Sequence, residues 1–380
     1  MYPYEHRMLE RLWFPVAREA DVDGAPFATS LLGRRLVLFR TERGVAAARD
    51  RCPHRGVALS LGQMRGGDLE CPYHGWRFNH DGVCTLVPSQ PGAHPLAGLD
   101  TVPAQTAYGL VWACLAEPYL PMPSIPEMAD DPDDGWESGF GSPFEVRCGL
   151  RSITENFRDS SHFAFVHKRV FGDVTPLIPA YEVRRDGWKL AWEFVLRYAQ
   201  EFQVQDGAGT GERYRFGGAD VDQADPSVSD EQLIHYRFSA IALSYVYTEH
   251  PHGGRRIVCQ VPAPVAVKGE GEEGMGRRVG GGGTECRVFW FVAANRRFRE
   301  HYGSVADQVD IERVIFAEDV PIVESLDPAE APLELDAQAH VRADRYSVAY
   351  RKLYRELLDE FAAAQPADAQ PTAAAGMITA

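Results

Sequence analysis

Two short turns in the first quarter of the chain each combine a cysteine with a histidine. The first reads CPHR and contains Cys52 and His54, and the second reads CPYHGW and contains Cys71 and His74. The prolines and glycines around them favour tight turns over helix or strand, so two neighbouring loops can clasp one metal centre. These four residues are the predicted ligands of that centre.

The distribution of ligand types indicates which centre this is. A structural zinc site usually pairs Cys with Cys and His with His, whereas here each turn supplies one of each. Two thiolates on one iron and two imidazoles on the other form a Rieske [2Fe–2S] cluster. The spacing, Cys-x-His, sixteen residues, then Cys-x-x-His, resembles that of the Rieske domain family. Structural zinc and ordinary buried cysteines are the alternatives.

Composition limits the other possibilities. Seven cysteines, in a sequence whose first residues do not look like an export signal, are a poor disulfide framework. A formal charge of −15 disfavours a nucleic-acid partner, and no apolar run approaches the ~18 residues that span a bilayer. We therefore expect a cytoplasmic protein that acts on small molecules, with no nucleic-acid or membrane partner.

The chain divides into parts of different character. Short apolar segments punctuated by Gly and Pro predict an all-β domain over residues 1–120, and the proline- and acid-rich residues 121–137 are interpreted as a linker. Long β-type runs and amphipathic helices over residues 138–363 predict an antiparallel sheet gripped by helices, so the fold class is α+β. Irregular structure is expected at three further places: residues 203–230, residues 266–285 and a disordered tail, 364–380.

A second group of candidate ligands lies in TENFRDSSHFAFVHKRVFGD, residues 154–173. Asn156, Asp159 and His162 recur every three residues and would lie along one side of a helix near 151–168. His167 follows His162 by five residues, about 500° of turn, so both imidazoles reach one metal only if the helix bends or ends between them. The apolar residues between the histidines would then pack inward around the site.

Two histidines and one carboxylate, with positions left open for O2, form the non-haem Fe(II) oxygenase site. The predicted carboxylate is Asp319 in VIFAEDVPIVES, because an acidic pair in an apolar helical run places charge where packing alone would not. Its neighbour Glu318 would face outward or support the site. Three competing carboxylates have ordinary explanations as solvated helix positions: Asp310, Glu312 and Glu324.

Together, the two groups of residues resemble the oxygenase components of Rieske non-haem iron oxygenases, over about residues 10–360. The segments LWFPVA, CPHR, EDVPIVES and RADRYSVAYRKLYREL look most like those of dicamba monooxygenase and vanillate O-demethylase. The resemblance implies a helix-grip, START-like catalytic domain. It also implies a mononuclear Fe(II) held by His162, His167 and Asp319, with Asn156 near the metal.

The resemblance further implies partners. Electrons would come from NAD(P)H through a flavin- or ferredoxin-type reductase, and three subunits would form a head-to-tail homotrimer in which one cluster faces the next iron. Asp159 would then bridge His74 of the neighbour and an iron-bound histidine.

We expect O2-dependent monooxygenation, by hydroxylation or oxidative demethylation, of an aromatic or other cyclic small molecule. A ring cis-dihydroxylating dioxygenase and a non-enzymatic electron-transfer protein are the alternatives. The strand SAIALSYVY lacks the asparagine with which similar demethylases grip a substrate carboxylate, so the substrate itself is not predicted. Tyr245 and Tyr247 in that strand are candidates for substrate contact or ordinary sheet aromatics.

Overall fold

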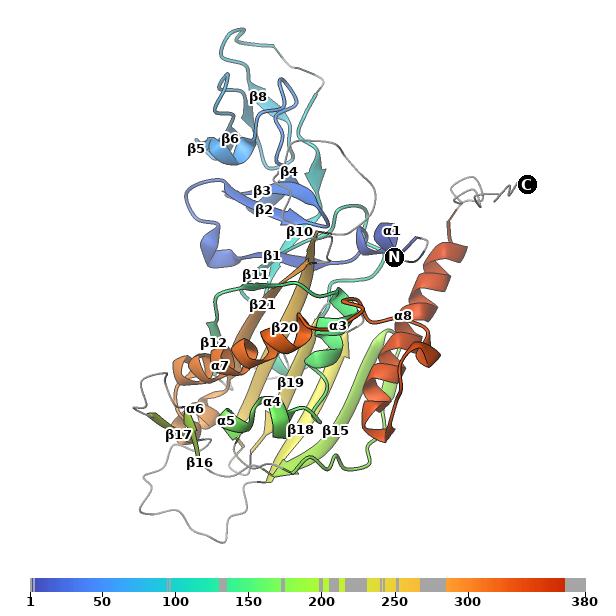
Figure 1. Ribbon diagram of the computed structural model, residues 1–380. Coiled ribbons are helices and arrows are strands. Elements are labelled where there is room, and N and C mark those ends of the chain that lie inside the picture. The colour runs from blue at the N-terminus through green and yellow to red at the C-terminus, as the bar shows by residue number, and fades with distance from the viewer. Residues whose placement is uncertain are drawn as a thin grey trace, which may run out of the picture.

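The computed structural model describes most of the chain in two β-rich parts (Figure 1). The described residues are 2, 4–93, 95, 97–129, 135–171, 175–197, 201–204, 212–215, 231–239, 241, 243–250, 253–266 and 285–365.

The first part is built from three small antiparallel sheets, which confirms the predicted all-β domain. Their strands run in the orders β1-β11-β10, β2-β3-β4-β9 and β5-β6-β7-β8. The strands are β1 (Phe14–Arg18), β2 (Phe27–Leu31), β3 (Arg34–Thr41), β4 (Gly44–Arg49), β5 (Gln63–Arg65), β6 (Asp68–Glu70), β7 (Arg77–Phe78), β8 (Cys84–Leu86), β9 (Thr101–Val102), β10 (Ala104–Ala107) and β11 (Leu110–Ala113).

Strand β3 explains how the cluster turns are supported. Its centre, LVLF, is apolar without alternation, which is typical of a strand covered on both faces. Leu36 and Leu38 join the large core that continues into the second part of the molecule. Val37 and Phe39 face a smaller core that contains the predicted ligands Cys52 and Cys71. The cluster turns therefore sit on a rigid, fully buried base.

The second part is an antiparallel sheet covered by helices, the predicted α+β arrangement. Its described strands follow the order β12-β21-β20-β19-β18-β15-β14, with β13 also paired to β21. The strands are β12 (Glu137–Phe140), β13 (Phe144–Val146), β14 (Arg184–Asp186), β15 (Lys189–Arg197), β18 (Glu231–Ser239), β19 (Ser244–Glu249), β20 (Arg255–Ala266) and β21 (Glu285–Ala294).

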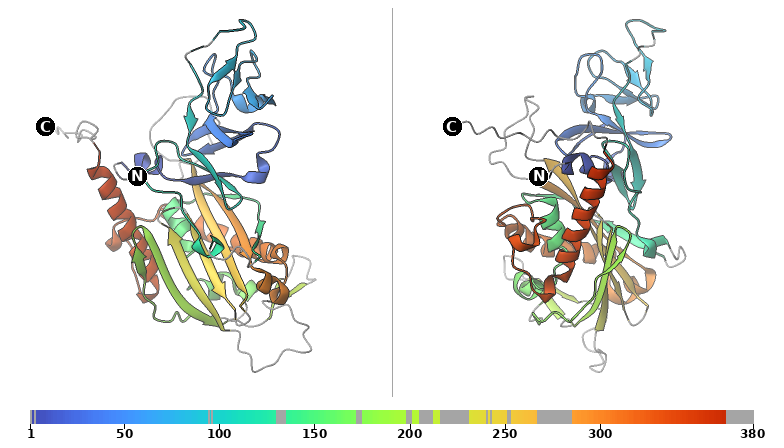
Figure 2. Two further views of the ribbon diagram at one scale, coloured as in Figure 1. Left: turned by 180° about the vertical axis from the view of Figure 1, so that it is seen from behind. Right: turned by 90° about the vertical axis from the view of Figure 1, so that its right-hand side faces the viewer.

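Helices α3, α7 and α8 gather on one side of this sheet, as the right view of Figure 2 shows. The amphipathic helices predicted within residues 138–363 include α7 and α8. A capping box starts α7, because Ser304 and Asp307 each satisfy the other's backbone N–H. The described helices are α1 (Glu5–Leu9), α2 (Pro126–Ala129), α3 (Leu150–Asn156), α4 (Phe163–Val166), α5 (Lys168–Phe171), α6 (Arg296–Tyr302), α7 (Val305–Val323) and α8 (Arg345–Ala363). None of the helices described is long and apolar enough to cross a membrane.

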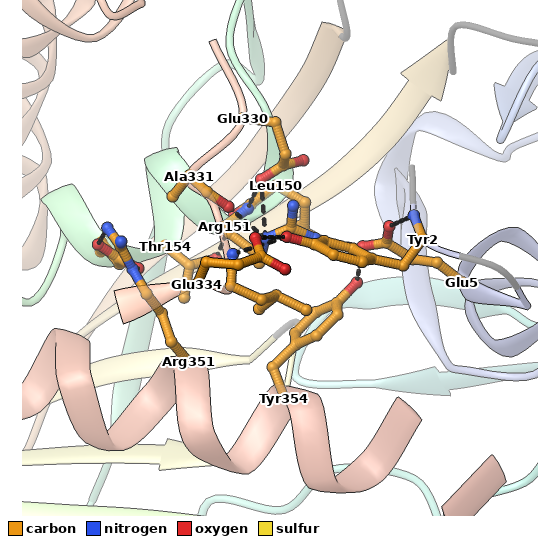
Figure 3. A network of polar contacts seen from close by, with 12 residues as sticks. Tyr2, Glu5, Leu150, Arg151, Thr154, Glu330, Ala331, Glu334, Arg351 and Tyr354 are labelled. Carbon is orange, nitrogen blue, oxygen red and sulfur yellow. Dashed lines mark hydrogen bonds and ion pairs between the residues drawn. The ribbon is translucent and has the colours of Figure 1, made fainter. Parts of the chain in front are cut away.

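A buried polar network ties the N-terminal helix to the catalytic part (Figure 3). Arg151 of α3 pairs with Glu5 of α1 and donates from Nε to the Ala331 carbonyl at 2.7 Å. Tyr354 of α8 donates to the same Glu5 carboxylate at 2.7 Å. Breaking a buried ion pair by removing one partner typically costs 3–5 kcal/mol, so this network holds α3 firmly in place.

Two sequence predictions concern loops and the tail. Much of residues 203–230 and 266–285 lies outside the described residues, as does the tail beyond residue 365. Strands β16 (Glu201–Val204) and β17 (Glu212–Arg215) pair with each other at the start of the first loop. The domain limits 1–120, 121–137 and 138–363 stay predictions.

Candidate metal centres

The two cysteine turns have the same backbone construction. In each turn the cysteine N–H donates to the carbonyl five residues on, and the cysteine carbonyl accepts from the glycine four residues on, at 2.8–3.1 Å. Those glycines, Gly56 and Gly75, have φ values of 76° and 69°, which most other residues avoid. The local sequence therefore folds each turn in the same way.

The structure brings the four predicted cluster ligands together. The rings of His54 and His74 lie 4.6 Å apart, and Trp76 stacks on His54 at 4.5 Å with a 7° interplanar angle. Burial, with a further contribution from the neighbouring Cys71 thiol, raises the pKa of the Cys52 thiol to about 11.

The donor atoms fit a [2Fe–2S] cluster. Two adjacent buried thiols would lose their protons when they bind iron and not by titration in water. Nδ1 of His54 is buried and has no hydrogen-bond partner among the described residues, as expected of an atom that binds metal.

The predicted iron ligands also converge. Nε2 of His162 lies 3.1 Å from Nε2 of His167, and Oδ1 of Asp319 lies 3.4 Å and 3.3 Å from these two atoms. Ligands at roughly 2.1 Å on one octahedral face would be about 3.0 Å apart, so this triangle fits a transition metal. Asp319 of α7, far along the chain, closes the site.

The helical stretch predicted near 151–168 is interrupted between Asn156 and His162 and ends again before His167, and these breaks build the site. Helix α3 ends at Asn156, and α4 starts only after His162. Oδ1 of Asp159 accepts from the Ser161 N–H at 2.8 Å and from its hydroxyl at 2.6 Å, a local turn that competes with the helical bonds. His162 and His167 flank the single turn of α4, which lets both rings reach one point.

Each histidine is oriented by a carboxylate on its other nitrogen. Nδ1 of His162 lies 3.1 Å from Oδ2 of Asp159, and Nδ1 of His167 lies 3.1 Å from Oε2 of Glu318. Such partners fix the tautomer and aim Nε2 at the metal. Glu318 thus supports the site, one of the two roles considered for it from the sequence.

Electrostatics in the site reflect this pairing. Burial lowers the pKa of His162, but hydrogen bonds with Asp159 and Asp319 outweigh burial and raise that pKa to about 9. Burial raises the pKa of Asp319, but its contacts with His162 and His167 outweigh burial and lower that pKa overall. The carboxylates around the two histidines thus create a negative environment that favours a bound cation.

The remaining sequence candidates lie in three different places: at the metal site, on the surface and in the interior. Asn156 donates from Nδ2 to Oδ1 of Asp319 at 3.3 Å, so it touches the site. Asp310 and Glu324 pair with surface arginines, as expected for solvated helix positions. Glu312 does not: only 6% exposed, it lies 3.7 Å from Arg256 in the interior. The solvated-face explanation was wrong for Glu312, because α7 is covered on that side.

The prediction that the residues between the histidines pack inward holds for Phe163 but not for Phe165. The ring of Phe163 contacts those of His162 and His167, whereas Phe165 is 73% exposed. A single helical turn has an outer side, and Phe165 lies on it.

Tyr245 and Tyr247 lie on the face of the sheet that points away from the metal ligands. The Gln260 side chain of β20 accepts a hydrogen bond from Arg158, which lies beside α3, so Gln260 faces the helices. Because side chains alternate along a strand, the even-numbered residues of β20 face the helices and the odd-numbered ones face the other way. Tyr245 pairs with Cys259 and Tyr247 with Ile257, on the other face. The Tyr245 hydroxyl donates to Glu127 of α2 at 2.9 Å. Both tyrosines are therefore sheet aromatics.

Comparison with known proteins agrees with this description. Residues 12–103 match the Rieske [2Fe-2S] domain, and residues 146–215 and 282–360 match the vanillate O-demethylase oxygenase C-terminal domain. The methylxanthine N1-demethylase NdmA of Pseudomonas putida is 27% identical over 93% of this chain and 90% of its own length. The structure of NdmA with caffeine superimposes with a TM-score of 0.72 at 25% identity, covering 94% of each chain. The oxidoreductase NdmD of the same organism is 39% identical over 28% of this chain and 19% of its own length.

The fold and the two sites define an iron–sulfur oxidoreductase with a separate catalytic domain. More specifically, the chain belongs to the Rieske oxygenases, as an oxygenase component related to N- and O-demethylases.

Proposed function

We propose that this protein is the oxygenase component of a monooxygenase that hydroxylates or oxidatively demethylates an aromatic or heteroaromatic small molecule. The convergence of His162, His167 and Asp319, with three donor atoms 3.1–3.4 Å apart, carries the proposal. The similarity to a methylxanthine N-demethylase and to a vanillate O-demethylase domain supports removal of a methyl group.

Iron held by these three residues would supply O2 activation beside the substrate. The chain's own residues do the rest. Asp159 and Glu318 hold the two imidazole Nδ1 positions, so both Nε2 atoms would be available to bind the metal. Asn156 holds Oδ1 of Asp319 through its amide. Cys52, His54, Cys71 and His74 would hold the [2Fe–2S] cluster that takes up electrons one at a time.

Electron delivery is proposed to cross between subunits of a head-to-tail homotrimer, a closed heterologous ring. Two exposed apolar areas support this arrangement. At the cluster end, Tyr73 is 64% exposed beside His74, and Leu61 is also exposed. On the catalytic part, Ile322 and Leu326 are exposed at the rim of a pocket of about 470 Å³.

The same pocket is lined by Asp159 and His162, so a cluster domain docked on it would bring His74 close to the iron ligands. Asp159 would then accept hydrogen bonds from both imidazoles, the bridging role expected from the sequence. Exposed apolar patches rimmed by polar residues commonly mark such interfaces.

A separate NAD(P)H-dependent reductase is proposed as the electron donor. The similarity of the cluster domain to part of the oxidoreductase NdmD supports an electron-transfer partner of that kind. The cytoplasm and the breakdown of aromatic compounds are the proposed setting.

The deciding experiment combines metal analysis with labelled oxygen. We expect about three irons per chain and one labelled oxygen atom per product formed under ¹⁸O2 with a surrogate reductase. Two labelled atoms in one product would instead identify a dioxygenase. About two irons per chain and no product would indicate that the protein is only an electron carrier.

A further inference from the structure

A second cavity of about 410 Å³ lies on the face of the sheet opposite the metal ligands. It forms where four stretches distant in sequence meet: the N-terminal segment at Trp13, residues 120–124 at the start of the linker, the turn between β14 and β15 at Trp188, and the segment before β19 at Ile241 and Leu243. Helix α2, a few residues further along the same linker, binds Tyr245 on that face. We call this cavity the linker pocket.

The inside of the linker pocket is apolar and aromatic. Trp13, Ile241 and Leu243 are buried and line it. Trp188 is half-buried, and the Arg185 guanidinium lies 5.3 Å from its ring centroid and steadies it. Small-molecule sites of roughly 300–1,000 Å³ with apolar, aromatic walls and a few polar groups have this character.

The mouth of the pocket carries one charge of each sign. Asp186 and Lys189 both line it, and Lys189 Nζ lies 3.3 Å from the Ser124 hydroxyl. An anionic ligand would meet the Asp186 carboxylate and a cationic one the Lys189 ammonium. An uncharged ligand with a hydrogen-bond donor and an acceptor on one edge suits both groups.

The surface around the pocket argues against a protein partner. Docking surfaces usually expose large apolar side chains. The exposed large apolar residues of the described chain lie elsewhere, and none of them lines this pocket: they are Leu61, Tyr73, Val83, Phe165, Leu177, Ile322, Leu326 and Val341. The apolar surface lies inside a cavity whose volume suits a small molecule.

The wall of the pocket also holds a strained residue. Ile241 has a φ of 93°, a conformation that a β-branched residue rarely adopts and that costs roughly 1–3 kcal/mol. Such strain persists where surrounding structure enforces it, and ligand-binding walls are a common place for it.

We propose that the linker pocket is a second small-molecule site, which binds an uncharged planar aromatic compound with a polar edge. The site is separate from the metal centre and does not depend on the proposed oxygenase reaction.

Equilibrium dialysis of the intact protein with 2-naphthamide tests this. We expect saturable binding that persists in Asp319→Ala, because that change disrupts only the metal site. Met122→Trp places a large ring in the pocket and should weaken binding at least tenfold, whereas Leu177→Trp, an exposed position elsewhere, should not. Lys189→Met alters only the exposed rim and should weaken binding severalfold even if Met122→Trp folds poorly.

The charged analogue 2-naphthoate should bind at least tenfold more weakly than 2-naphthamide. Absence of saturable binding, or binding that is lost in Asp319→Ala but kept in both pocket variants, would overturn the proposal. So would equal affinity for the amide and the carboxylate.

Discussion

Oε2 of Glu318 lies 3.1 Å from Nδ1 of His167, and Asp319, the next residue in the chain, presents Oδ1 to the other nitrogen of that ring at 3.3 Å. Two carboxylates that are adjacent in sequence thus contact the two nitrogens of one imidazole ring. Successive residues on a helix differ by about 100° in direction, so the pair spans the width of the ring. This geometry predicts different roles for the two acids.

Replacing Glu318 with Gln should weaken iron binding about 10-fold, because the amide loses the charge that holds the His167 N–H. Iron retention during dialysis against a chelator measures this. Glu324→Gln, at the C-cap of the same helix but paired with exposed Arg147, is the matched control and should retain iron normally. Equal iron retention in both variants would make Glu318 a packing residue only.

Replacing His162 or Asp319 with Ala should abolish turnover while the visible spectrum of the cluster stays intact, because the two sites use different residues. Cys52→Ala or Cys71→Ala should remove that spectrum. Absorption spectra and product assays of soluble variants distinguish the sites. Loss of the cluster spectrum in the folded Asp319→Ala protein would refute the division into two centres.

Asp159→Asn should leave the trimer, the cluster and most of the iron in place but slow turnover by about 10–100-fold. Asparagine has nearly the same shape, yet it lacks the charge that strengthens hydrogen bonds to two imidazoles. In rapid-mixing experiments the reduced cluster should stay reduced after O2 and substrate are added. Reoxidation at the unmodified rate would return Asp159 to a purely local role.

Subunit mixing tests whether electrons cross between chains. A His74→Ala variant and a His162→Ala variant should each be inactive alone, since one lacks the cluster and the other lacks the iron. Mixed trimers should recover part of the activity, because an intact cluster then faces an intact iron site. No recovery in trimers shown by mass spectrometry to be mixed would rule out the head-to-tail path.

His250 should make the protein sensitive to acid. Burial lowers its pKa to about 3, and the nearby charge of Arg256 acts in the same direction. The unfolded chain takes up this proton below about pH 6.5, so stability falls as pH decreases from there, by about 2 kcal/mol at pH 5. Urea unfolding at pH 7 and pH 5 should show a smaller loss in His250→Gln, and no change in that loss in His301→Gln, an exposed position. An equal loss in wild type and His250→Gln would contradict this.

The local sequence was sufficient for the cluster turns. Cys52, His54 and Gly56 lie within one turn, so residue types and spacing contain nearly all the information about its shape. The same holds for the long strands, whose apolar runs show which segments are covered on both faces.

The tertiary structure decided what depends on distant segments. The break after Asn156 arises from a competing turn at Asp159, and periodicity alone gave no sign of it. The role of Glu318 and the burial of Glu312 follow from what packs on α7, which no local pattern records. The linker pocket likewise exists only because four distant stretches meet. Spacing along the chain specifies local geometry, whereas contacts between remote residues depend on how the whole core closes.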